Sequence, residues 1–335
     1  MDIVTQALLG SAVAQLGAKN HELKIAAFVG CIAGILADAD IFIRSTSDPL
    51  LLLDYHRHFT HAIAFIPIGA IIGALVCWPF VRKKINFGRL YFFAFLGYLL
   101  SGILDAFTGY GTHLFLPFSD VRVNANLISI IDPIFTVSLL VGVIGNLKYK
   151  SKKVIIVSLL FCSAYLATAY LQQNRATNIQ SEIANKRGHI IEKSIIKPTL
   201  GNIILWRSIY LYQGNYYIDA IRVGLTKDNV YQGEVVQSVI AKNNFSTIDS
   251  DSLLYQDIVR FQTFSNNYIA LDPRNQSILG DIRYSMLPTS ADPLWGITIN
   301  PGKTDEHTPY LTMRKHNAKL RQQYFDMVLG QYIKQ

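Results

Sequence analysis

The chain has 335 residues, of which 50% are apolar and only 16% are charged, and its formal net charge is +8. This balance excludes an ordinary single soluble domain. The basic residues lie in short segments between apolar runs, so membrane topology explains the charge better than binding to nucleic acid does. No nucleic-acid partner is predicted. Cys31, Cys77 and Cys162 all fall within apolar segments, which argues against a disulfide framework or a thiolate metal cluster.

The first half of the chain carries nearly all of the long apolar runs. A helix needs roughly 20 predominantly apolar residues to cross a bilayer, and five runs approach or exceed that length. We predict membrane spans at 23–43, 60–82, 90–109, 126–146 and 153–172. The run from Val4 to Leu16 is too short to span comfortably and predicts a re-entrant or bundle-capping helix.

Basic residues give these spans an orientation. They cluster before the first span, between the second and third, and between the fourth and fifth, as follows: Lys19, Lys24; Arg82, Lys83, Lys84, Arg89; Lys148, Lys150, Lys152, Lys153. The positive-inside rule makes these segments cytoplasmic. An odd number of crossings then places the C-terminal part in the periplasm of a Gram-negative cell, so we expect a multi-pass inner-membrane protein.

The chain becomes polar after the last apolar run, so we place a domain boundary near Gln172 and predict a transmembrane domain at 1–172 and a soluble domain at 173–335. The run NIILWRSIYLYQGNYYIDAIRVGL has strand-like alternation with a turn at 213–215. Helices are predicted near 250–264 and 308–332. The expected fold is an all-α membrane helical bundle with a C-terminal α+β extramembrane domain.

Acidic and imidazole side chains gather at the ends of the predicted spans. They are Asp38 and Asp40 in GILADADIF, His56, His58 and His61 in YHRHFTHA, Asp105 and His113 in LDAFTGYGTH, and Asp132 in IIDPIFT. On the predicted topology they all lie on one side of the bilayer. Charged side chains at membrane depth are costly and mark functional sites, and carboxylate with imidazole is the ligand mixture preferred by zinc and related ions. The sequence therefore predicts a divalent-metal site, with zinc favoured.

Each element also has a structural interpretation. Asp38 and Asp40 could cap a helix or form a calcium-like oxygen pair, and the three clustered histidines could be interfacial anchors or a proton-sensitive patch. Asp105 could be a hydrogen-bonded structural carboxylate. Asp132 precedes a proline and could simply cap a helix. Arg57 could hold a phosphate or a carboxylate, or could reach towards head groups.

Other polar residues carry weaker predictions. Asp2, Thr5 and Gln6 would join the same layer if the short first helix starts on the outer side. The histidines of the C-terminal part, His189, His307 and His316, are predicted to be isolated surface or core residues.

The ordered motifs MDIVTQALLG, GILADAD, YHRHFTHA, LDAFTGYGTHLFLPFSD and IIDPIFT together resemble the YdjM-type family of inner-membrane proteins, proposed to be metal-dependent hydrolases. The resemblance covers about the first 210 residues. It implies a helical core similar to that of zinc-dependent phospholipase C, in which His and Asp side chains hold zinc ions that activate water against a phosphodiester. The residues that match the family motifs are Asp38, Asp40, His56, His61 and Asp105.

The chain departs from the family pattern at two places. Many members have Thr-His where this chain has Thr5-Gln6, and again where it has Ser101-Gly102. His58 and His113 stand where Gly and Gln are more usual, and could supply the missing ligands. Otherwise the site would hold fewer ions than in the relatives.

These observations favour hydrolysis of a phosphoester, possibly in a lipid head group, by metal-activated water. Asp105 would bind metal or accept the water proton, and Arg57 would neutralise the substrate anion. The remaining ligands would be Asp38, Asp40, His56 and His61, with His58 and His113 as further candidates. The alternative is a non-catalytic membrane protein with a structural or sensing metal site. Transport is a weaker third, because the acidic residues gather at one face.

Overall fold

The computed structural model describes residues 1–314 and 317–331, and the chain divides into two compact units. The helical unit comprises Met1–Ile43, Tyr55–Leu171 and Leu200–Ile203. The C-terminal unit comprises Arg44–Asp54, Gln172–Thr199 and the described residues from Ile204 onward. The chain therefore leaves the helical unit between residues 43 and 55 and then returns to it.

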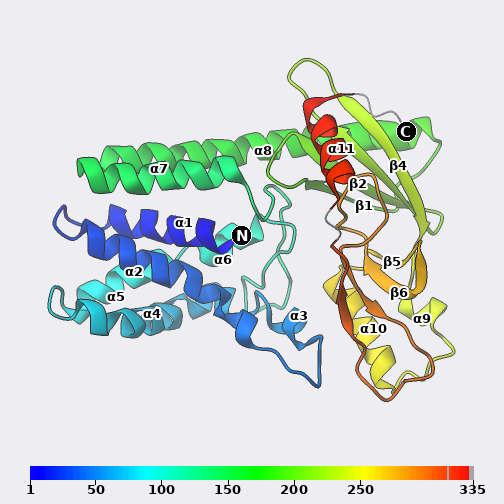
Figure 1. Ribbon diagram of the computed structural model, residues 1–335, viewed down its shortest axis with the longest axis horizontal. Coiled ribbons are helices and arrows are strands. Elements are labelled where there is room, and N and C mark those ends of the chain that lie inside the picture. Colours follow the sequence, from blue (N-terminus) through cyan, green and yellow to red (C-terminus); the bar gives the residue numbers. More distant parts are fainter. Residues whose placement is uncertain (315–316, 332–335) are drawn as a thin grey trace. The chain divides into compact units, whose positions relative to one another are not determined.

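The helical unit is built from long helices that run alongside one another (Figure 1). They are α1 (Ile3–Leu16), α2 (Leu23–Leu36), α4 (Ile66–Val81), α5 (Phe87–Tyr98), α7 (Pro133–Tyr149) and the first part of α8 (Lys152–Lys186). Shorter elements lie near their ends: the 3₁₀ turns η1 (Ala37–Phe42), η2 (Phe59–His61) and η3 (Ile63–Phe65), and the helix α6 (Ser101–Ala106). The short helix α3 (Leu51–Tyr55) lies, except for its last residue, in the segment that belongs to the C-terminal unit. The connections α1–α2, α4–α5 and α7–α8, which carry the basic clusters, lie at the same end of this unit.

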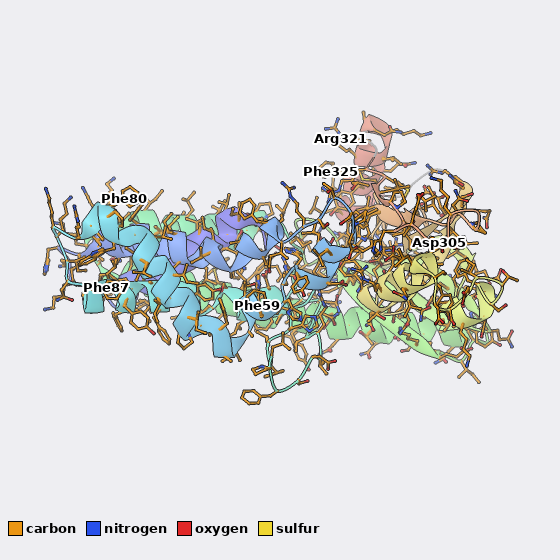
Figure 2. The ribbon with its side chains drawn as sticks, turned by 90° about the horizontal axis from the view of Figure 1, so that it is seen from below. Phe59, Phe80, Phe87, Asp305, Arg321 and Phe325 are labelled. Carbon is orange, nitrogen blue, oxygen red and sulfur yellow. The ribbon has the colours of Figure 1, made fainter. Side chains whose placement is uncertain are left out.

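Four helical segments are long and apolar enough to cross a membrane: Leu23–Phe42, Ile63–Val81, Phe87–Ala106 and Lys152–Lys186. Helix α4 exposes Ile68, Leu75 and Phe80, as expected for a lipid-facing perimeter. Figure 2 shows Phe80 and Phe87 at one end of the helical unit and Phe59 at the other. The prediction of an all-α membrane bundle is confirmed.

Two predicted spans differ in their limits from the helices that correspond to them in the structure. The segment predicted at 126–146 becomes helical only at Pro133, because Asp132 caps α7 by accepting hydrogen bonds from the N–H groups of Ile134 and Phe135. Helix α7 therefore has 17 residues, and is about 26 Å long at about 1.5 Å per residue. The helix that contains the last predicted span is longer than that span, because α8 continues to Lys186.

Helix α1 is the innermost helix of its unit, although its apolar run is short. It packs against α2, α5 and α7, and every residue from Leu9 to Gln15 is buried. A Cβ atom at Gly10 would come within 2.2 Å of the Gly30 carbonyl oxygen and 2.9 Å of the Gly97 carbonyl oxygen. Only glycine allows three helices to approach so closely. The predicted capping or re-entrant helix is thus a central one, because small residues let its neighbours close around it.

The C-terminal unit contains two antiparallel sheets, each with its strands in sequence order. The first has β1 (Lys193–Pro198), β2 (Leu205–Tyr212), β3 (Asn215–Arg222) and β4 (Asn229–Gln237), and the second has β5 (Ile269–Asp272), β6 (Asn275–Asp281), β7 (Trp295–Thr298) and β8 (Tyr310–Thr312). The helices are α9 (Ala241–Asn244), α10 (Leu253–Phe264) and α11 (Ala318–Leu329). The predicted α+β class is confirmed.

Short sequence patterns predicted some of the elements in this unit correctly and others wrongly. The predicted turn at 213–215 joins β2 and β3, and Gln213 and Gly214 have positive φ angles of 45° and 73°. Helix α10 begins at Leu253, where the Ser252 side chain caps it. The helix predicted at 308–332 is wrong at its start, because Tyr310–Thr312 pairs with β7 as a strand and α11 begins only at Ala318. The prediction for His316 lies outside the described residues.

Candidate metal centre at one end of the helical unit

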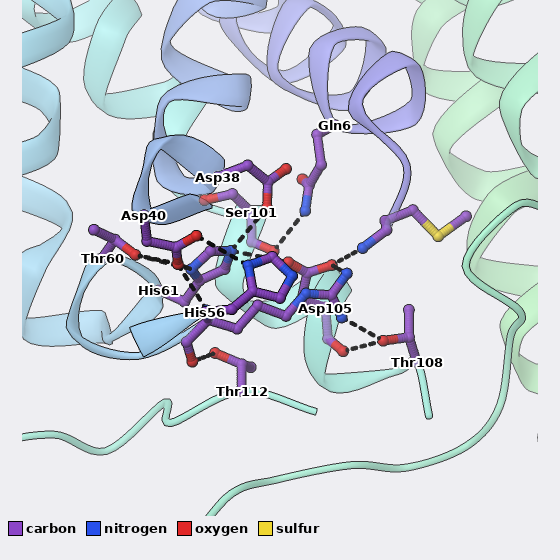
Figure 3. A network of polar contacts seen from close by, with 12 residues as sticks. Gln6, Asp38, Asp40, His56, Thr60, His61, Ser101, Asp105, Thr108 and Thr112 are labelled. Atoms are coloured by element: carbon purple, nitrogen blue, oxygen red, sulfur yellow. Dashed lines mark hydrogen bonds and ion pairs between the residues drawn. The ribbon is translucent and has the colours of Figure 1, made fainter. Parts of the chain in front are cut away.

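The candidate site forms where α2 tightens into the 3₁₀ turn η1, which carries Asp38 and Asp40. The turn η2 supplies His61, and α6 supplies Asp105 from a position far along the chain. Figure 3 shows these side chains converging with His56. The structure therefore brings together the five residues that match the family motifs.

The imidazole of His61 lies at the centre of this group. Its Nε2 atom is 3.3 Å from Asp38 Oδ1 and 3.0 Å from Asp105 Oδ2. One ligand atom from each of these three residues lies within 4.8 Å of the others, which is close enough to share one ion. His61 Nε2 and Asp105 Oδ2 are buried and, within the described part of the chain, neither has a hydrogen-bond partner outside this group of three residues. Buried polar atoms that lack an ordinary hydrogen-bond partner are rare, so Nε2 and Oδ2 are candidates for binding an ion.

Asp40 lies on the opposite side of the His61 ring. Its Oδ2 atom is 3.3 Å from His61 Nδ1 and accepts hydrogen bonds from the Thr60 hydroxyl at 2.9 Å and the Arg57 backbone N–H at 2.7 Å. Its Oδ1 atom is 3.0 Å from His56 Nδ1. A carboxylate at Nδ1 fixes the tautomer that leaves Nε2 able to bind an ion. The geometry thus gives Asp40 an orienting position, whereas Asp38 and Asp105 face Nε2.

The backbone at Arg57 helps to build this arrangement. Arg57 has φ 61°, a left-handed conformation that side-chain-bearing residues rarely adopt. This conformation accompanies the hydrogen bond from its N–H to Asp40. Its guanidinium is only 3% exposed, lies 3.2 Å from Asp105 Oδ1 and donates to the Thr108 hydroxyl at 2.9 Å.

Asp105 is completely buried and meets positive charge on one of its oxygens. Arg57 and the amino group of Met1 both lie against Oδ1, whereas Oδ2 faces His61. A buried carboxylate requires such compensation, because burial without a counter-charge is costly. Oδ1 is thus held by the protein, and Oδ2 is the atom that an ion could use.

His58 and His113 form a separate pair, with ring centroids 5.0 Å apart. Neither belongs to the group whose ligand atoms lie within 4.8 Å of one another. His113 Nδ1 is 2.6 Å from the Asp120 carbonyl oxygen, and Arg122 Nε donates to His113 Nε2 at 3.3 Å. Burial and the neighbouring Arg122 lower the pKa of His113 to about 4, so the ring is neutral at pH 7. Both of its nitrogen atoms are then engaged by the protein.

The two positions at which the family pattern is broken also lie beside the site. Gln6 is 1% exposed, and its Nε2 donates to the Ser101 carbonyl oxygen at 3.2 Å (Figure 3). A Cβ atom at Gly102 would be 2.2 Å from the His61 carbonyl oxygen, so this backbone accepts no side chain there. Asp132, the N-cap of α7, also accepts a hydrogen bond from the Tyr165 hydroxyl at 2.8 Å, which agrees with its structural interpretation.

The C-terminal unit holds two polar features that the sequence did not indicate. Asp48, Asp257 and His307 form a second group with ligand atoms within 4.8 Å of one another. His189 stacks on Tyr212 at 4.4 Å between ring centroids and lines a cavity of about 330 Å³. His307 and His189 are therefore not isolated. No local pattern could have found either feature, because the partners lie far apart in sequence.

Comparisons with known proteins match the chain to a family model and to a curated relative. A family model described as "YdjM inner membrane protein" matches residues 1–176. The chain is also similar to the protein described as "Uncharacterized protein YfhP" of Bacillus subtilis (strain 168), with 24% identity over 260 residues, covering 75% of this chain and 76% of the relative. No solved structure matches the chain.

Proposed function

This chain belongs to the YdjM inner membrane protein family, and on that premise we propose that it is a divalent-metal-dependent hydrolase acting on a phosphoester. The observation that carries the proposal is the buried group formed by His61 Nε2, Asp38 Oδ1 and Asp105 Oδ2. Membership of the family and the apolar helices make the chain a membrane protein. The bound metal and the hydrolytic reaction are the parts that we propose.

The donor atoms fit a divalent ion of the zinc type. Carboxylate oxygens and imidazole nitrogens both bind zinc, and a catalytic zinc with three protein ligands keeps a further position for water or substrate. Asp40 behind His61 supplies the outer contact that such histidines normally make. A divalent ion held by these residues would supply an acidified water and would stabilise charge on a phosphoryl oxygen.

The surrounding residues receive roles from their contacts. Arg57 is buried and already engaged with Asp105 and Thr108, so we assign it to holding Asp105 in place of the substrate-binding role suggested by sequence. His56 is 26% exposed and contacts Asp40. It is therefore the histidine of this group best placed to exchange a proton with solvent.

A lipid head group is the substrate class that we favour. Large apolar side chains are exposed on the segments next to the site: Phe59, Ile63, Phe115 and Phe118, the last 91% exposed. Ile63 N–H donates to the Leu114 carbonyl oxygen at 3.0 Å, which ties the segment carrying Phe115 and Phe118 to the start of the lipid-facing helix α4. Such a rim beside a polar centre suits contact with lipid. The basic connections lie at the other end of the unit, which supports a periplasmic position for the site.

The second candidate function is a structural or sensing metal site without turnover. The observation in its favour is the engagement of Asp105 Oδ1 by both Arg57 and the Met1 amino group, which makes the network partly self-sufficient. In this case the ion would complete the packing of η1, η2 and α6.

Metal analysis and activity assays on the purified full-length protein separate these functions. We expect a bound divalent ion and release of a phosphoester product from a synthetic phosphodiester or from phospholipid vesicles. Both should be lost in His61→Ala and Asp105→Asn, and both should persist in His21→Ala, which removes an exposed histidine from the α1–α2 connection. A bound ion without turnover would support the structural alternative, and an unsubstituted protein that binds no divalent ion would refute both functions.

A further inference from the structure

The segment Arg44–Asp54 belongs to the C-terminal unit, although it joins two parts of the candidate metal centre. It follows η1, which carries Asp38 and Asp40, and it ends two residues before His56. Movement of this segment would therefore be transmitted through the backbone to residues on both sides of the site.

One arginine holds this segment near both of its ends. Arg260 on α10 forms a fork with Asp48, with Nη1–Oδ1 and Nη2–Oδ2 distances of 3.1 and 3.0 Å. The same guanidinium contacts Asp54 Oδ2 from Nε at 3.1 Å and from Nη2 at 2.5 Å. A planar, forked donor fixes the orientation of its carboxylates more strongly than a single point charge can.

Arg260 is itself anchored within the C-terminal unit. It donates to Asp257 Oδ1 at 2.9 Å, and Asp257 is fully buried and also accepts from the Thr308 N–H at 2.9 Å. The segment adds its own anchors, because Leu50 and Leu53 are buried. The pairing is therefore part of a packed structure, unlike an isolated surface ion pair.

This geometry also explains the second group of possible metal ligands, Asp48, Asp257 and His307. The Arg260 guanidinium bonds to both carboxylates, and His307 Nδ1 is 3.0 Å from Asp257. Positive charge from the protein already compensates these acids, so an ion there would have to displace the arginine. The group is better described as an ion-pair cluster that fastens a segment.

We propose that Arg260 is a positioning residue for the candidate metal centre, which it influences by fixing the segment between Asp40 and His56. The inference rests on the proposed function, and it adds a task for the C-terminal unit: to hold the ligand-bearing turns at the correct separation. Without Arg260, Asp48 and Asp54 lose their shared anchor and repel each other. The contact between the Arg57 N–H and Asp40 then loosens, because Arg57 lies only three residues beyond Asp54.

The test uses the full-length protein in lipid nanodiscs, with Arg260→Gln, Arg260→Lys and the control Arg175→Gln. Arg175 forms a more exposed pair with Asp228 in the same unit, at 3.1 Å. The first readout is Zn²⁺ affinity, which we expect to fall roughly tenfold in Arg260→Gln, the lower end of the range for loss of a direct contact to a metal ligand. The second is hydrogen exchange of the peptide containing residues 55–61, which should become faster. Arg260→Lys should restore part of each effect, and Arg175→Gln should change neither.

Zn²⁺ affinity and hydrogen exchange together decide whether Arg260 positions the site. Unchanged affinity or unchanged exchange of residues 55–61 in Arg260→Gln would overturn the positioning role, even if residues 44–54 alone exchanged faster. A similar loss in Arg175→Gln would also overturn it, because the effect would then be a general weakening of the unit. If the unsubstituted protein binds no zinc, the proposed function has failed. Exchange of residues 55–61 then decides the positioning role alone, and faster exchange in Arg260→Gln supports it.

Discussion

The substitution Asp40→Asn distinguishes an orienting carboxylate from a direct metal ligand. It keeps the size of the side chain but removes the negative charge that faces His61 Nδ1 at 3.3 Å. The imidazole then loses the anionic partner of Nδ1 and keeps only the Thr60 hydroxyl, at 3.0 Å, on that side, while Nε2 still faces Asp38 and Asp105. Outer carboxylates of this kind typically contribute a factor of about 10 to 100 in metal affinity, which is roughly 1.4 to 2.7 kcal/mol of binding free energy.

The assay is competitive Zn²⁺ titration of purified protein, with Co²⁺ absorption spectra as a report on coordination geometry. We expect Asp40→Asn to weaken binding within that range and to preserve the Co²⁺ spectrum, because the coordinating atoms do not change. Asp38→Asn should weaken binding more and should alter the spectrum. Asp120→Asn, at an exposed position, is the control and should bind as the unsubstituted protein does. An altered spectrum in Asp40→Asn, with a loss of affinity as large as in Asp38→Asn, would show that Asp40 binds the ion directly. Unchanged affinity would show that Asp40 neither binds the ion nor orients His61.

Three further predictions concern a close backbone contact, the membrane topology and an ion pair. Gly102→Ala should destabilise the protein by about 1 to 3 kcal/mol, because the added Cβ would lie 2.2 Å from a carbonyl oxygen. Thermal unfolding in detergent measures this loss of stability. The control Gly88→Ala should lose no stability, because the atom nearest to its added Cβ is 3.8 Å away. Reporter fusions after Lys84 and at the C-terminus should report opposite sides of the membrane, and a cytoplasmic C-terminus would contradict the topology. Burial raises the pKa of Asp48, but the hydrogen bonds from Arg260 have the opposite and larger effect, so the pKa in the folded protein is lowered. The ion pair should therefore stabilise residues 44–54 fully above the unfolded pKa of about 4. This stabilisation should be lost as the pH falls through the lower pKa of the folded protein. Hydrogen exchange at pH 6 and pH 3, corrected for intrinsic rates, should show this loss, and equal protection at both values would refute it.

Much of the fold could be predicted because the relevant signals are local. A span needs one long apolar run, and the four helices that satisfy this condition lie where such runs occur. The hairpin at residues 213–215 depends on a short turn signal in the same way. The helix predicted from residue 308 was wrong at its start, because pairing with β7 makes Tyr310–Thr312 a strand, and pairing partners are not visible in a local pattern.

The candidate site was predictable in its residue types but not in its arrangement. The motifs indicated carboxylates and imidazoles near the ends of several spans, and the structure brings together Asp38, His61 and Asp105. The sequence could not tell which nitrogen of His61 faces which carboxylate, nor that His58 lies against His113. Those relations depend on the rotation of each turn, which packing against neighbouring helices determines.

The sequence by itself determined the apolar spans, the basic connections between them and the set of ionisable groups, since each is a property of a short stretch of chain. Only the tertiary structure decided that the short helix α1 lies inside its unit, where Gly10 meets Gly30 and Gly97. It also decided that Arg260 fastens Asp48 and Asp54, from a position more than 200 residues away. The physical reason is that contacts between distant segments depend on how whole helices and sheets pack, and no periodicity within one segment encodes them.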